Sequence, residues 1–362
     1  MNPVEQAIRK VDATQQRHTP AAFVFGVVKK FGDDNGGVLV SNLAYSAFVS
    51  LFPLLLILMT ILGLIASVDK SFRESTVKNA VAGQIPLIGS QLTANVHELQ
   101  RASVIGLIVG LLFLIWGVTG LAQAGLFTMA QVWNLPGPSR PGYVQRLGRA
   151  VLFLCLLGGG VIVTTGLSYR TQYLHNGFWL KFLIEVVTAA FNAGIYLGAF
   201  RALTPKGVPT RALLPGAITG GVLWTLLQLL GTYLVHHFLH SDSVYGAFAT
   251  VLGLLAWIYL AVEMTVYCAE INVVLARRLW PRSIVQPPLT EADRSSMALQ
   301  ALQNQRRPEQ HIEVTFDDRP PDEGVPARTP QTPDEVAPPA DQPAANARVP
   351  APRGASGGDR VK

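Results

Sequence analysis

Apolar residues fill the chain in long stretches between about residue 36 and residue 276, and charged residues are nearly absent from these stretches. The segments 35–68 and 102–139 contain no Asp, Glu, Lys or Arg. A helix needs about 20 apolar residues to cross a bilayer, and backbone groups inside lipid must be satisfied within the segment. The pattern predicts six membrane-spanning helices, at 38–66, 104–132, 148–168, 180–202, 212–238 and 245–275.

Polar segments flank this apolar region on both sides. The lead at 1–36 contains a stretch, 21–31, that mixes Phe and Val with two lysines, which predicts an amphipathic helix at the membrane interface. The tail holds 14 of the 24 prolines, and its composition cannot bury enough apolar surface to fold. We therefore predict an all-α chain with a lead at 1–36, a membrane domain at 37–280 and a disordered tail at 281–362.

Composition and charge support a membrane protein and predict its orientation. Hydrophobic residues make up 49% of the chain and charged residues 14%, against about 25% charged in an average soluble protein. Of the basic residues that flank the spans, 14 lie in the lead or after the second, fourth and sixth spans, and six lie on the other side. Basic loops stay inside, so we expect a plasma-membrane protein with both termini in the cytoplasm and no nucleic-acid partner.

The sixth span carries the polar residues that are most costly to place in a membrane. It contains Glu263, Glu270 and Asn272, and a charge at mid-span costs roughly 2.5–3.5 kcal/mol. For Glu263 two readings stay open, a wet cavity or a satisfied hydrogen bond. For Glu270 the choice is between a place on a transport pathway and an ion pair at the membrane edge, with a basic residue such as Arg201 or Arg277.

The first span is also unusual for its polar residues and its proline. Asn42 and Tyr45 lie in its first half, and Pro53 follows in the middle. Proline removes a backbone hydrogen bond, which predicts a kink. Kinked helices line many transport sites, although proline is also tolerated in ordinary membrane helices.

Small residues recur at a spacing of four in the later spans, at 190, 194 and 198 and at 216 and 220. This spacing permits close approach of helices, so we interpret it as packing. The sequence contains no P-loop, no zinc-peptidase motif and no serine-hydrolase motif. We therefore expect no enzymatic activity, no metal and no cofactor.

Two passages carry a family resemblance. Residues 43–56 read LAYSAFVSLFPLLL, and residues 244–275 read VYGAFATVLGLLAWIYLAVEMTVYCAEINVVL. They resemble the first and the closing span of the YihY/BrkB family of bacterial inner-membrane proteins, and the likeness covers about residues 20–280. The residues that match the family pattern are Tyr45, Pro53, Tyr245, Gly246, Glu270 and Asn272. Glu263 falls where that pattern is usually apolar.

The resemblance implies a six-helix integral membrane protein but brings no settled molecular activity. The family was once labelled ribonuclease BN, a label that these residues do not support, and some members have been linked to movement of envelope lipids. We expect a transport-type role that moves or gates an amphipathic envelope component, such as a lipid, with Glu270 and Asn272 on the path. The alternative is a scaffolding membrane protein whose cytoplasmic tail recruits a partner. A homo-oligomer is compatible with both.

Overall fold

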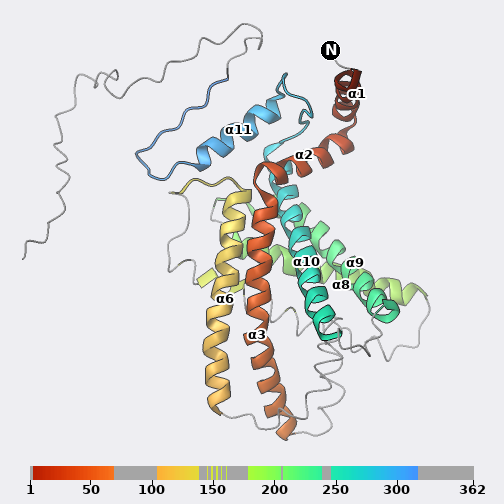
Figure 1. The fold of residues 1–362 in the computed structure, drawn as a ribbon, viewed down its shortest axis with the longest axis vertical. Helices are drawn as coiled ribbons and strands as arrows, with labels where there is room; N and C mark the ends of the chain where they lie inside the picture. The colour runs from red at the N-terminus through yellow and green to blue at the C-terminus, as the bar shows by residue number, and fades with distance from the viewer. Residues whose placement is uncertain are drawn as a thin grey trace, which may run out of the picture. The chain divides into compact units, whose positions relative to one another are not determined.

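The computed structural model describes residues 3–68, 104–137, 178–204, 207–238 and 246–316, with isolated positions between 145 and 160. Within these ranges, side chains are left undescribed mainly at 53–111 and 232–250. The elements are α1 (Pro3–Arg17), α2 (Thr19–Asp33), α3 (Gly36–Val68), α6 (Val104–Val132), α8 (Phe178–Leu203), a 3-10 turn (Thr210–Leu213), α9 (Leu214–Phe238), α10 (Gly246–Arg277) and α11 (Glu291–Gln303) (Figure 1). The described residues are thus helical without a strand, which confirms the predicted all-α class for them.

The apolar stretches form helices where the sequence predicted them. Five of the six predicted spans coincide with α3, α6, α8, α9 and α10. The span predicted at 148–168 lies outside the described residues apart from isolated positions. Among the described residues, three segments are long and apolar enough to cross a membrane, Phe182–Leu203, Thr210–Gly231 and Val251–Arg277, and a bent helix pair would make a fourth. The total of six spans stays a prediction.

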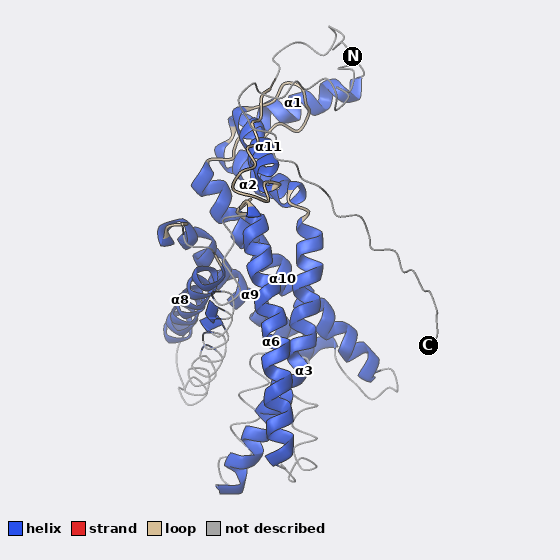
Figure 2. Ribbon diagram, turned by 90° about the vertical axis from the view of Figure 1, so that its left-hand side faces the viewer, coloured by secondary structure: helices blue, strands red, loops and turns tan. Residues whose placement is uncertain are grey.

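Long helices pack side by side around a core of small and branched residues. α3 lies along α6, α10 contacts both α3 and α9, and α8 lies along α9 (Figure 2). Glycines let α8 and α9 approach closely at Gly220, which belongs to the predicted repeat, and at Gly221, which does not. A Cβ on Gly220 would lie 2.7 Å from a ring atom of Tyr196, and one on Gly221 would lie 2.4 Å from the backbone nitrogen of Ala193. At Gly194 a Cβ would meet nothing within 4 Å.

A sharp bend separates α2 from α3. The two helices meet at 70° across a break of two residues, Asp34 and Asn35, and Asn35 has a φ of 56°. Asparagine is among the few residues that adopt this left-handed conformation readily. α2 covers the predicted amphipathic stretch at 21–31, and the bend carries it across one end of the bundle, against α10.

The prediction that residues 281–362 are disordered is wrong for the first part of this segment. Residues 291–303 form α11, which begins at a capping box between Thr290 and Asp293. We call residues 279–303 the cap. It lies against α2 at the bent end of the bundle (Figure 1). The composition led to a wrong prediction because α11 is held against α2 by polar contacts and not by a broad apolar face. Residues 317–362 lie outside the described residues.

Candidate functional site

A buried ionic cluster joins α2, the α2–α3 break and α10. Lys30 and Glu270 are 0% exposed and the Asp34 side chain is 1% exposed. The ammonium of Lys30 pairs with Asp34 and lies 3.6 Å from Oε2 of Glu270. It also donates a hydrogen bond of 3.1 Å to the carbonyl of Val132, at the end of α6. One lysine therefore links three helices at the bent end of the bundle.

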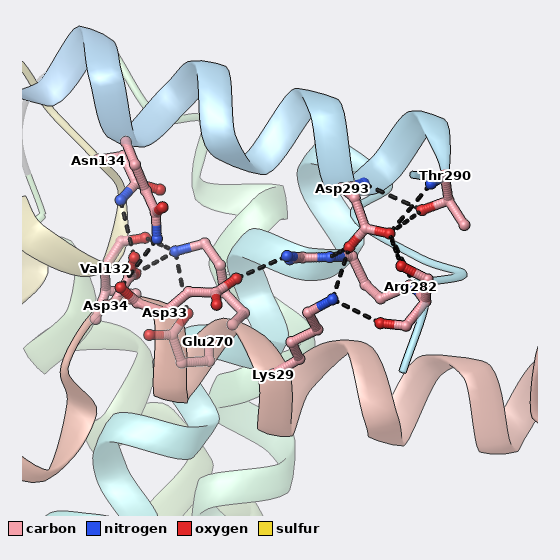
Figure 3. Close-up of polar contacts among 12 residues, drawn as sticks. Lys29, Asp33, Asp34, Val132, Asn134, Glu270, Arg282, Thr290 and Asp293 are labelled. Atoms are coloured by element: carbon pink, nitrogen blue, oxygen red, sulfur yellow. Dashed lines mark hydrogen bonds and ion pairs between the residues drawn. The ribbon is translucent and has the colours of Figure 1, made fainter. Parts of the chain in front are cut away.

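Asn134 extends this cluster toward the cap. Its Nδ2 donates to Oδ1 of Asp34 at 3.0 Å and lies 3.1 Å from Oε1 of Gln303 in α11. Its φ of 47° ends α6 in the left-handed conformation. Figure 3 shows Asn134, Asp34 and Glu270 gathered on one side of the view, near the end of α2. The cluster is therefore continuous from a membrane-type helix, α10, to the cap.

Asn272 points to a different neighbour from Glu270. Its Oδ1 accepts a hydrogen bond of 2.6 Å from the backbone nitrogen of Gly216, in the first turn of α9. This contact satisfies one of the N–H groups that a helix start leaves free. A Cβ on Gly216 would lie 2.0 Å from the carbonyl oxygen of Cys268, so only glycine fits this crossing. Asn272 thus fixes the α9–α10 contact, while Glu270 faces α2.

A second cluster holds the cap through Asp293, which is fully buried. Arg282 Nε donates to Oδ1 of Asp293 at 2.6 Å, and Lys29 Nζ donates to the same oxygen at 2.9 Å. Oδ2 accepts from the backbone nitrogen of Ser283 at 3.0 Å and from the hydroxyl of Thr290 at 2.8 Å. Figure 3 shows these side chains converging on Asp293 from α2 and from the segment before α11.

The charge state of Asp293 follows from these contacts. Burial alone would raise the pKa of its carboxyl, but the hydrogen bonds from Ser283, Arg282 and Lys29 outweigh burial and hold the pKa well below its usual range. Arg282 also donates to Oδ2 of Asp33 at 2.7 Å, so one guanidinium bridges the cap and the end of α2. The carboxylate therefore stays ionised at neutral pH and anchors α11.

A polar cleft of about 590 Å³ opens beside the two clusters. Its lining comes from the α2–α3 break, the ends of α6 and α11, and the residues that follow each of those two helices. Among the lining residues are Asp33, Asp34, Gln131, Gln303 and Arg306. Asp34 belongs both to the cleft lining and to the buried cluster, so the cleft adjoins the site.

The residues predicted from the sequence do not gather in one place. Glu270 and Asn272 are buried, as described above, and Glu263 is half-buried on α10. Asn42 is exposed, and Tyr45 is 69% exposed, so both face away from the helices packed around α3. α3 runs as one helix from Gly36 to Val68, and the predicted kink at Pro53 falls where side chains are not described.

The partner proposed for Glu270 was wrong. The sequence suggested Arg201 or Arg277, but Arg201 donates to the carbonyl of Val208 and Arg277 to that of Trp133. The partner is Lys30, from the polar lead. Sequence reasoning missed Lys30, Asp34, Arg282 and Asp293, although the charges crowded just before the first span and after the last span were a usable signal.

Comparison with known proteins supports the conclusion that this chain is a membrane protein. A family model described as Virulence factor BrkB matches residues 27–289. This range contains both Lys30 and Glu270, and also Arg282, but it ends before Asp293 and α11. No solved structure matches this chain.

The curated relatives are named UPF0761 membrane proteins. A protein of Psychrobacter sp. is 23% identical over 71% of this chain and 49% of its own length. A protein of Alteromonas mediterranea is 23% identical over 70% of this chain and 87% of its own length. One of Pseudomonas aeruginosa is 25% identical over 70% of this chain and 62% of its own length. The chain therefore spans about half the length of the first of these relatives and less than two thirds of the third.

Proposed function

This chain belongs to the virulence factor BrkB family of membrane proteins, and on that premise we propose for it a non-enzymatic, transport-type role. It moves or gates an amphipathic envelope component, such as a lipid, at the plasma membrane of a bacterium. The bent end of the bundle, with the cap, lies on the cytoplasmic side. This orientation is supported by the excess of basic residues in the lead and after the even-numbered spans.

One observation carries the proposal. α3 contains no charged residue, yet it exposes Asn42 and Tyr45 within the first three turns after the 70° bend. Residues three apart lie on the same helical face, so these side chains form a polar strip. Ser41 is exposed beside them, and the apolar side chains of Val38 and Phe52 are exposed on the same helix. An amphipathic molecule needs this combination, with polar contacts for its head and apolar surface for its chains.

The polar cleft supports the same role. It opens at the end of α3 from which the strip begins, and its lining mixes carboxylates and amides with Arg306. Polar groups are costly within a membrane-type bundle unless they are satisfied or face water. We propose that the polar head of the transported molecule passes between the strip at Asn42 and Tyr45 and the cleft.

The alternative is a scaffolding protein whose C-terminal segment recruits a cytoplasmic partner. It is favoured by the docking of α11, which lies beyond the family match yet is anchored to Lys29 and Arg282 inside that match. A segment fixed in this way would hold a partner close to the membrane. The residues that follow, 317–362, would then bind the partner.

Reconstitution of the full chain in vesicles tests the transport role. Vesicles of phosphatidylethanolamine and phosphatidylglycerol would carry a trace of a fluorescent head-labelled phospholipid, and an impermeant reductant would bleach the outer leaflet. We expect the protein to let the reductant bleach more than the half of the label that protein-free vesicles lose. Bleaching that stops at the protein-free level would reject lipid movement and favour the scaffold.

Matched variants test whether the polar strip of Asn42 and Tyr45 is responsible for the bleaching of the inner leaflet. Tyr45→Ala and Asn42→Ala should slow the second phase of bleaching several-fold. Glu185→Gln serves as a control, because Glu185 is an exposed residue of α8 and lies outside the proposed path. Equal rates for all of these variants and the unchanged protein would remove Asn42 and Tyr45 from the path.

A further inference from the structure

The buried cluster of Lys30, Asp34 and Glu270 does not balance in charge. Two carboxyl groups share one ammonium, and all three side chains are excluded from solvent. The titratable groups that act on Glu270 are Lys30 from α2 and Asp34 from the α2–α3 break. The helices α3, α6 and α9, which complete the surroundings, contain no Asp, Glu, Lys or Arg. Fully ionised, the cluster would keep one uncompensated negative charge.

Nearby basic residues are occupied elsewhere. Arg277 donates to the carbonyl of Trp133, and Arg201 donates to that of Val208. Lys29 and Arg282 bind Asp293 in the second cluster. None of these four acts on Glu270, whose charged neighbours are Lys30 and Asp34. One proton on the cluster would balance its charge.

Hydrogen bonding decides which of the two carboxyl groups would hold the uncompensated negative charge. Asp34 accepts from Lys30 through Oδ2 and from Asn134 through Oδ1. Neither oxygen of Glu270 receives a hydrogen bond from the residues that the structure describes. Lys30 Nζ, at 3.6 Å from Oε2, is beyond the usual limit of about 3.2 Å. A buried carboxylate without donors is strongly unfavourable, whereas a neutral carboxylic acid costs much less to bury.

We propose that Lys30, Asp34 and Glu270 form a buried proton-binding site, in which Glu270 holds one proton and Asp34 stays ionised beside Lys30. The protonated carboxyl gains an O–H that can donate to the facing carboxylate of Asp34, and the cluster becomes neutral. This proposal does not depend on transport, because it concerns what the cluster holds at rest.

The geometry also gives the proton a route to solution. Asp34 is a lining residue of the polar cleft, its carboxylate is 1% exposed, and it interacts electrostatically with Glu270. A proton from water in the cleft can add to the Asp34 carboxylate and then pass to Glu270, which leaves Asp34 ionised again and paired with Lys30. Loss of the proton runs through the same groups in reverse. The site joins α2 to α10, so its occupancy would alter the contact between these helices.

Infrared spectroscopy of the full chain in an ester-free detergent, where no lipid ester carbonyl absorbs in the same region, tests the site directly. A buried carboxylic acid shows a C=O stretching band that is separate from carboxylate and amide bands, and this band shifts in heavy water. We expect the band at neutral pH in the unchanged protein and its loss in Glu270→Gln, which mimics the neutral form. Glu263→Gln, the same change two turns earlier on α10, should keep it.

Two outcomes would overturn the proposal. One is an unchanged protein without any carboxylic-acid band at neutral pH, a result that stands even if the variant does not fold. The other is a band that survives in Glu270→Gln, which would place the proton on a different residue. Neither measurement uses a transported molecule, so failure here is separate from failure of the vesicle assay.

Discussion

Arg282 and Asp293 form a buried ion pair, with Nε 2.6 Å from Oδ1 and both side chains no more than 1% exposed. Arg282 lies within the family match, whereas Asp293 lies beyond it. The same guanidinium reaches Asp33 at 2.7 Å. This pair therefore joins α11 to the membrane domain and makes the cap part of the folded unit.

Truncation should reveal how much the cap contributes. A chain that ends at residue 288 loses Asp293 and with it the charge-assisted hydrogen bonds from Arg282 and Lys29, each worth roughly 1.5–3 kcal/mol. We expect a lower melting temperature in detergent than for a chain that ends at residue 316, which keeps every contact of α11. Equal melting temperatures for the two truncations would show that α11 adds nothing to stability.

The contribution of Asp293 should depend on pH with a definite sign. Its pKa is lowered on folding, so its stabilisation is present above the unfolded pKa of about 3.9 and is lost as pH falls through the folded value. The melting temperatures of the unchanged protein and of Asp293→Asn should therefore differ by a constant amount from about pH 7 to pH 5. The difference should shrink below about pH 4. A difference that grew on acidification would contradict this assignment.

Gly216 offers a packing test with a matched control. Gly216→Ala would place a Cβ 2.0 Å from the carbonyl oxygen of Cys268, whereas Gly194→Ala would meet nothing within 4 Å. Overpacking of this kind costs about 1–3 kcal/mol, so we expect less Gly216→Ala protein in the membrane and a lower melting temperature. Gly194→Ala should be close to neutral. If both variants behave alike, the α9–α10 crossing is looser than described.

Glu270 and Asn272 should matter more for the cellular phenotype than Glu263. We expect Glu270→Gln and Asn272→Ala to impair the phenotype that the gene supports, and Glu263→Gln to have a smaller effect. Membrane abundance, measured alongside, separates function from folding. Normal abundance with a normal phenotype would remove Glu270 from the functional residues, and reduced abundance alone would indicate a structural role.

Cysteine labelling can test the predicted orientation. In a background in which Cys155 and Cys268 are replaced by alanine, a cysteine at residue 90 should react with an impermeant reagent added outside intact cells. A cysteine that replaces Arg306, beside the polar cleft, should react only after the membrane is opened. The reverse pattern would place the cap outside.

The sequence by itself determined the class of the protein and the positions of most helices. Apolar runs with few or no charges predicted five helices close to where they lie, and α6 covers 104–132 as predicted. The helices could be predicted because helix formation in an apolar segment is a local property: its backbone groups are satisfied within the helix itself. The sequence also singled out Glu270 and Asn272, because polar groups at such depth are rare and costly.

Only the tertiary structure decided which groups meet. Glu270 lies 3.6 Å from Lys30 because the bend at Asp34 and Asn35 carries α2 across the end of α10, and no local pattern specifies that approach. α11 escaped prediction for a related reason. Its composition is polar, and the contacts that hold it come from far along the chain, as Lys29 and Asp293 are 264 residues apart. Composition reports how much apolar surface a segment can bury, whereas ion pairs depend on distances that only the packed helices set.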